Sequence, residues 1–216
     1  MAPRTKFSAA AGTLTAAALL LTACGGGHDK KIASSPTPSD TTASQTTAPP
    51  TTPAADPSAP TFDLPSDVKI TIDPDTTGDK TKDAILRDQA YGLEATYVAV
   101  TKPDKNFPLF THYFIEDAVE TWSESIDTMK KNHHTITGTV HYYDRKVTIG
   151  SKTAGVTFCE DQRNLYDKDT RTGKVVTTTP SANSYIFHTS LMRKAKDGTW
   201  QTATYVSQRG AARCQP

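Results

Sequence analysis

The sequence has 216 residues, with 24 Lys and Arg against 23 Asp and Glu, for a formal net charge of +1. A chain of this length suggests one domain with extensions. The balanced charge gives no support for binding to nucleic acid or to an anionic membrane surface.

Residues 1–23 have the pattern of an export signal. Arg4 and Lys6 form a short positive region, and Phe7 to Leu21 is an apolar stretch built mainly from Ala and Leu. The stretch is too short and too rich in small residues for a stable transmembrane helix. The sequence therefore predicts export, with the general secretory route as the simpler interpretation.

The signal ends in Leu21-Thr22-Ala23-Cys24, where an aliphatic residue and two small residues precede a cysteine. This run resembles the lipobox of bacterial lipoproteins, in which a peptidase cuts before the cysteine and the thiol is acylated. The resemblance implies that Cys24 carries a lipid and that the protein lies on the outer face of the bacterial cytoplasmic membrane. The alternative is an ordinary signal peptide with a cysteine just past its cleavage site.

Residues 24–61 are interpreted as a disordered tether. The run 34–60 consists of Ser, Thr, Pro, Ala, Asp and Gln, with no aromatic and no large aliphatic residue. Such a composition cannot bury enough apolar surface to offset the entropy of ordering, and its prolines favour extended conformers. We therefore expect a spacer between the lipid and one folded domain, residues 62–216.

The first half of this domain has helical patterns. Residues 62–73 alternate, as expected of a short edge strand or an extended arm. Residues 81–101 carry an apolar stripe at helical spacing, and Asp79 or Thr81 is the candidate N-cap. A short helix is expected to begin at Pro108, and a second long helix over 115–131.

After this region the apolar period changes to two. The segments with this pattern or with β-rich composition are 135–143, 146–150, 154–161, 174–179, 184–193 and 200–207. Asp197-Gly198 is the strongest hairpin signal in the chain. Helices followed by a meander predict an α+β fold, with the helices packed on one face of a curved antiparallel sheet.

Cys159 and Cys214 are the cysteines that remain beside Cys24. In an exported protein, an even remainder of two predicts one disulfide between them. The alternative is two free thiols, which are uncommon outside the cytoplasm.

The order helix, short helix, helix and sheet resembles the NTF2-like (cystatin-like, SnoaL-type) cone fold over about residues 80–216. The runs "VTFCED", "DKDTRTGK" and "SYIFHTSLMRKAKDGTW" are similar to the ending of actinobacterial lipoproteins of unknown function, and "DGTW" is similar to the final hairpin of Mce-associated membrane proteins. In enzymes of the NTF2-like family an Asp and a polar partner inside the cone act as base and orienter. No hairpin is visible between the helices, where many family enzymes have one, and this weakens the transfer of an active site.

A concave pocket in such a cone has candidate lining residues. They are Tyr91, Tyr97, Trp122, Tyr142, Tyr185 and His188. Alternatively, together with Phe187, they simply fill the core between helices and sheet. Asp144, His141 and His188 lie on or beside expected strands, so an inward His188 with Tyr91 or Tyr97 is the candidate for an enzyme-like site. A core or surface histidine is the plainer interpretation.

The remaining polar motifs have ordinary structural explanations. Glu160 and Asp161 are interpreted as a solvated strand end rather than a pocket mouth. The adjacent His133 and His134 point in different directions, so no metal site is expected there. Residues 167–174 lack the ligand pattern of a calcium loop and predict a hairpin turn.

Together these patterns predict a lipid-anchored domain that binds an envelope protein or a small apolar ligand without catalysis. We assign no catalytic residue, no cofactor, no metal and no nucleic-acid partner. The alternative is an NTF2-like enzyme of isomerase, hydrolase or cyclase type that uses an interior Asp/His pair. A purely structural envelope component is the third interpretation.

Overall fold

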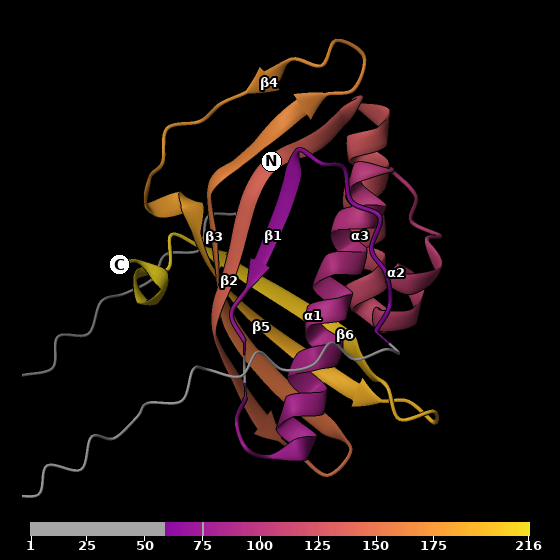
Figure 1. Ribbon diagram of the computed structural model, residues 1–216. Coiled ribbons are helices and arrows are strands. Elements are labelled where there is room, and N and C mark those ends of the chain that lie inside the picture. Colours follow the sequence, from indigo (N-terminus) through magenta and orange to yellow (C-terminus); the bar gives the residue numbers. More distant parts are fainter. Residues whose placement is uncertain (1–58, 75) are drawn as a thin grey trace, which may run out of the picture. The chain divides into compact units, whose positions relative to one another are not determined.

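The computed structural model describes residues 59–74 and 76–216 (Figure 1). The expected signal segment, Cys24 and nearly all of the expected tether lie outside these residues. The helices and strands, in chain order, are β1 (Val68–Ile72), α1 (Lys80–Thr101), α2 (Pro108–Tyr113), α3 (Glu116–Lys131), β2 (His134–Ile149), β3 (Thr153–Asp169), β4 (Val175–Val176), β5 (Tyr185–Lys194) and β6 (Trp200–Arg209). Two short 3₁₀ turns, η1 (Ala182–Ser184) and η2 (Ala212–Cys214), flank the last two strands.

The strands form one curved sheet in the order β1-β2-β3-β5-β6, with β4 paired to β3. The three helices lie on one face of this sheet (Figure 1). Strands β2 to β6 pair antiparallel as expected, but β1 pairs parallel to β2, so the prediction of a purely antiparallel sheet is wrong. A parallel pair needs a crossover connection, and α1, α2 and α3 supply one between β1 and β2.

The long strands β2 and β3 bend around the helices. Their register shifts twice, between Thr139 and His141 and again between Tyr143 and Lys146. Such bulges insert unpaired residues that increase the local bend of a strand. Gly138 lies beside the first shift at a φ of 107°, and a Cβ there would lie 2.0 Å from a backbone oxygen of β3, so only glycine fits.

The helices form where their sequence pattern places them. The Asp79 carboxylate accepts hydrogen bonds from the backbone N–H groups of Thr81 and Lys82, at 2.8 and 3.2 Å, and so caps α1. In α3, acidic residues occupy the first turn and basic residues the last, which suits the helix dipole. The short helix α2 begins at Pro108, as expected.

Two apolar clusters between the helices and the sheet form the core. One joins α1 to the sheet and includes Leu86, Phe158 and Trp200. The other joins the three helices and includes Phe110 and Ile126. The predicted stripe of α1 is thus buried on the sheet side, which is the packing expected of an α+β domain.

A third cluster lies on the face of the sheet that the helices do not cover. The disulfide between Cys159 and Cys214, the pairing that the sequence predicts, lies at its centre and ties η2 to β3. Tyr185 belongs to this cluster. The prediction that Tyr185 lines a pocket with His188 is therefore wrong. The two residues are three positions apart on β5, and side chains that an odd number of positions separates point to opposite faces of a strand.

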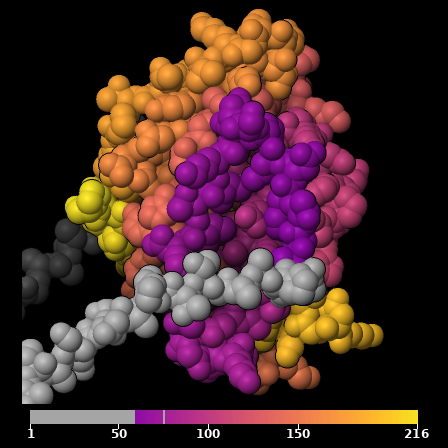
Figure 2. All heavy atoms as spheres, in the orientation of Figure 1, coloured from indigo at the N-terminus to yellow at the C-terminus, as the bar shows by residue number. Residues whose placement is uncertain are grey.

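The segment before β1 runs as an extended arm and then enters the sheet as an edge strand, so both expectations for residues 62–73 hold in part. Phe62 packs against Tyr91, with ring centroids 6.1 Å apart, and Leu64 packs on the first core cluster. Figure 2 shows this indigo arm spread over the face of the domain that it presents. Tyr91 is therefore covered by the arm and by Tyr113 rather than facing a pocket.

Candidate functional site

A cavity of about 190 Å³ lies between the helices and the concave face of the sheet. Helices α1 and α3 form one wall, and β2, β3, β5 and β6 form the other. Its lining includes three of the predicted residues, Tyr97, Trp122 and His188. The cavity is smaller than the 300–1,000 Å³ of most drug-sized sites, but an apolar cavity of about 150 Å³ can hold a benzene ring.

Glu160 and His188 are the titratable pair of this cavity. They come from adjacent antiparallel strands, β3 and β5, and strand alternation turns both toward the helices. His188 Nε2 lies 2.7 Å from Glu160 Oε2, and His188 Nδ1 lies 2.9 Å from the hydroxyl of Ser207. The two residues are each only 3% exposed. A carboxylate and an imidazole are therefore held together at the edge of an apolar space.

Three further donors converge on the other carboxylate oxygen of Glu160. The hydroxyls of Tyr97 and Tyr142 lie 3.2 Å from Oε1, and the side-chain amide of Gln162 lies 2.7 Å from it. The two phenol oxygens also lie 3.2 Å from each other, and Tyr142, which was expected to line a pocket, is not part of the cavity lining. The carboxylate thus receives the several hydrogen bonds that a buried charge requires.

The electrostatics follow from this arrangement. Burial alone raises the pKa of Glu160, but the hydrogen bond and the charge of His188 outweigh it and hold that pKa below its ordinary value. Burial, and then the nearby charge of Glu160, raise the pKa values of Tyr97, Tyr142 and Tyr205 well above 10, so these phenols stay protonated. The site therefore holds an ionised carboxylate among neutral hydroxyl donors.

The hydrogen bonds that Glu160 and His188 already make within the protein limit their use in proton transfer. Glu160 accepts from four side chains, and both ring nitrogens of His188 have partners inside the protein. A general base must lie within hydrogen-bond reach of the proton that it removes, and a carboxylate with a lowered pKa is a weak base. The rest of the lining is largely apolar, with Val100, Met129, Ile136, Leu165 and Ile186. The geometry suits holding an apolar group better than proton transfer.

The prediction that Glu160 is a solvated strand end is wrong. The even-numbered residues of β3 point into the core, where Ala154, Val156 and Phe158 are each 1% exposed or less, and Glu160 continues that face. The alternation that identified the strand could therefore have found the glutamate as well. Asp161 points away and pairs with Arg163 at 2.8 Å.

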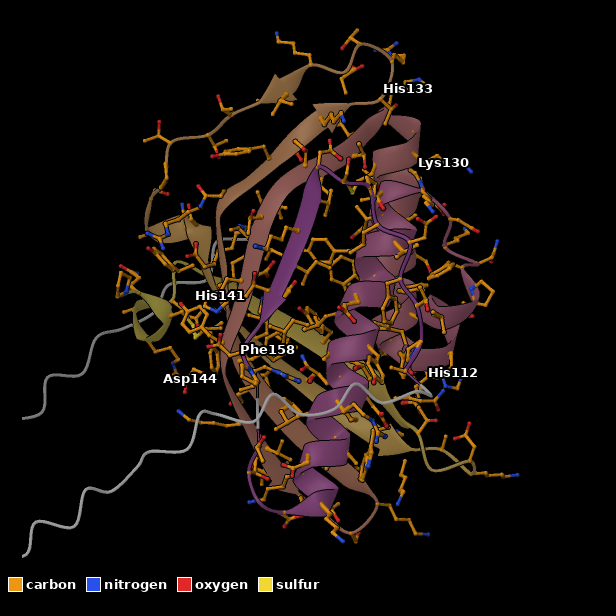
Figure 3. The ribbon with its side chains drawn as sticks, viewed as in Figure 1. His112, Lys130, His133, His141, Asp144 and Phe158 are labelled. Carbon is orange, nitrogen blue, oxygen red and sulfur yellow. A yellow bond between two sulfur atoms is a disulfide. The ribbon has the colours of Figure 1, made fainter. Side chains whose placement is uncertain are left out.

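Asp144 and His141 do not contribute to an interior Asp/His pair of the kind that the enzyme interpretation expects. Both lie on the side of the sheet away from the helices (Figure 3). His141 pairs there with Asp73 at 2.7 Å, and Asp144 pairs with Lys146 at 2.9 Å, both half exposed. The interior carboxylate is Glu160, so an Asp/His pair is corrected to a Glu/His pair.

Two other motifs have structural roles. Residues 167–174 form the expected hairpin, in which Asp169 accepts from the backbone N–H groups of Arg171 and Thr172, at 2.9 and 2.8 Å. Its pKa falls to about 2, chiefly because of these backbone bonds and the Thr172 hydroxyl. His133 follows the C-cap of α3 in a left-handed conformation (φ 58°) at the surface (Figure 3). Over residues 59–74 and 76–216, no three His, Cys, Asp or Glu side chains are grouped as metal ligands.

No helix within the described part of the chain is both long and apolar enough to cross a membrane.

Comparison with known proteins gives a likeness of fold. No family model matches the sequence. No curated protein matches it either.

Solved structures that share the fold include the following three. A ketosteroid isomerase-like protein from Erwinia carotovora is 16% identical, with a TM-score of 0.42, over 61% of this chain and 97% of that one. An NTF2-like protein from Cytophaga hutchinsonii is 15% identical, with a TM-score of 0.39, over 61% and 99%. An NTF2-like superfamily protein from Salmonella enterica is 14% identical, with a TM-score of 0.39, over 57% and 91%. At these identities and scores the likeness says nothing of activity or ligand.

Proposed function

We propose that this protein is a lipid-anchored lipoprotein of the bacterial envelope whose NTF2-like domain binds a small apolar ligand without catalysis. The single observation that carries the binding function is the cavity between α1, α3 and the sheet. Its carboxylate and imidazole are saturated by partners in the protein, and its remaining walls are mainly apolar. A ligand there gains affinity from burial of apolar surface rather than from chemistry at the pair.

Filling the cavity should abolish this binding. Val100 lines the cavity from α1, so Val100→Phe places a ring in the space that the ligand would occupy. The probe is 1-octanol, followed by the ¹³C-methyl shifts of Ile136, Leu165 and Ile186. We expect a saturable shift in the parent protein and at least a tenfold weaker response in the variant.

The matched control is Val206→Phe, because Val206 is 65% exposed on β6 and is not part of the cavity lining. It should bind 1-octanol like the parent. Absence of saturable methyl shifts in the parent protein, or equal binding by the Val100→Phe variant, would contradict a ligand-binding cavity.

The anchor is tested separately. Cys24→Ser removes the thiol that the lipid needs, so the protein is expected to move from the membrane fraction to the soluble fraction of cells. Immunoblotting of the two fractions measures this. The Val206→Phe variant leaves both Cys24 and the disulfide intact and should remain with the membrane. Full membrane retention of the Cys24→Ser protein would exclude the lipobox.

The Glu160–His188 contact inside the cavity favours one second candidate, an enzyme that uses this pair as base and orienter. The two functions differ in what happens to a bound ligand. Mass spectrometry of ligands extracted with the purified protein, before and after long incubation, should show unchanged molecules for a binding protein. Conversion that is lost in a Glu160→Gln variant would establish the enzyme instead.

A further inference from the structure

The cavity continues into a wider groove. A second hollow of about 460 Å³ lies beneath the connection that carries β4 and η1. It shares its inner wall with the cavity through Met129, Ile136, Gln162, Leu165 and Arg209. An elongated ligand can therefore place one end in the cavity and the other in the groove.

Arg209 is the cation where the two hollows meet. Its guanidinium donates to the backbone carbonyl of Asn183 at 3.2 Å and, among the described residues, has no carboxylate partner. Four other surface arginines have such a partner, namely Arg87, Arg163, Arg171 and Arg193, whereas Arg213 lies over the ring of Phe187. Arg209 is therefore a positive charge at the mouth of an apolar cavity, and none of the described carboxylates forms an ion pair with it. Asp167 lies along the groove, where its carboxylate opposes binding of an anion.

Two polar groups of the cavity that can donate a hydrogen bond have no partner among the described residues. The indole N–H of Trp122 is buried without a hydrogen bond, and the hydroxyl of Tyr205 makes none within the described residues. The carboxylate of Glu160, by contrast, already accepts from four side chains. A ligand that complements these groups brings acceptors rather than donors.

We propose, on the basis of the ligand-binding function above, that the ligand is an amphipathic anion. Its apolar part lies in the cavity and its acidic group pairs with Arg209 at the mouth. A carboxylate suits the planar fork of a guanidinium, which can donate two parallel hydrogen bonds to it.

Octanoate and 1-octanol test this pairing because they share an alkyl chain and differ in the charged group. The protein is the exported full chain with Cys24→Ser, so that no detergent competes for the cavity. Calorimetry at low salt should show that Arg209→Gln weakens octanoate binding about fivefold and leaves 1-octanol unchanged. Asp167→Asn should strengthen octanoate binding about twofold, since it removes the opposing charge.

The control is Arg213→Gln, because Arg213 lies over Phe187 on the other face of the sheet. It should bind both compounds like the parent. If the Arg209→Gln variant loses binding of octanoate and of 1-octanol equally, or loses binding of neither, the role of Arg209 is overturned while an apolar binding site remains. Failure of the parent protein to bind either compound would overturn the proposed function itself.

Discussion

A variant in which Cys159 and Cys214 are both replaced by alanine is expected to lose about 4 kcal/mol of its free energy of unfolding. The disulfide joins residues 55 positions apart, and in the chain-entropy model a cross-link of that span removes about this much from the unfolded state. A loss of that size is a large fraction of the 5–15 kcal/mol that typically stabilises a domain. Urea denaturation should show a lower midpoint, and a changed slope would report a less compact unfolded state.

The same variant should loosen the C-terminal residues. Apart from the disulfide, η2 is held by the hydroxyl of Tyr143, which donates to the carbonyl of Cys214, and by Arg213, which lies 4.3 Å from the ring centre of Phe187. Hydrogen exchange near Cys214 should accelerate in the variant. Reduction of the parent protein by a thiol reagent is the control and should reproduce both effects. A loss under about 1 kcal/mol would show that these contacts hold the segment without the bond.

The elements of the fold that follow from local signals could be predicted from the sequence. The Asp79 cap, Pro108 at the start of α2 and the alternation along β3 and β5 each depend on residues close together in the chain. The parallel pairing of β1 could not be predicted in this way. The pairing depends on which edge of the sheet remains open after the hairpins form. The residues of Val68–Ile72 carry no local signal for that edge.

The candidate site was predictable only in part, for a related reason. Tyr97, Trp122 and His188 meet because two helices and the sheet fold together, whereas Tyr91 and Tyr185 differ only in which neighbour covers them. The type of an aromatic residue does not distinguish a cavity wall from a core or an outer cluster. An acid after a cysteine resembles a strand end, but the position of Glu160 in the alternation of β3 assigns it to the inner face.

The last prediction concerns the buried pair. His188→Phe is expected to lower the free energy of unfolding by about 3–5 kcal/mol, because it leaves the charge of Glu160 buried without the imidazole that contacts it at 2.7 Å. The chain offers a matched control in His141→Phe. The His141–Asp73 contact is also 2.7 Å long, but its side chains are 40% and 48% exposed, so its loss should cost less than about 1 kcal/mol. Urea denaturation of the two variants at neutral pH compares them directly.

The free energy of unfolding of the parent protein and that of the His188→Phe variant should depend on pH with opposite sign. In the parent protein the pKa of Glu160 is below its ordinary value of 4.5. The contribution of Glu160 to the free energy of unfolding is therefore complete above pH 4.5 and is lost as the pH falls through the lower native pKa. In the His188→Phe variant the lowering by His188 is gone, and burial raises the pKa of Glu160 instead. The variant is then destabilised as the pH rises through that raised pKa, so the difference between the proteins should be smallest in acid.

A double variant decides whether the pair itself matters. Glu160→Leu together with His188→Phe removes the buried carboxylate as well as the imidazole, so it should be more stable than His188→Phe alone, as replacement of a buried polar pair by apolar residues often is. If the double variant also retains binding of 1-octanol, the pair positions strands and closes the cavity rather than acting on the ligand. A double variant no more stable than the single one would instead place the loss in the packing of His188 between Phe158 and Tyr205, whose ring centres lie 4.8 and 5.0 Å away.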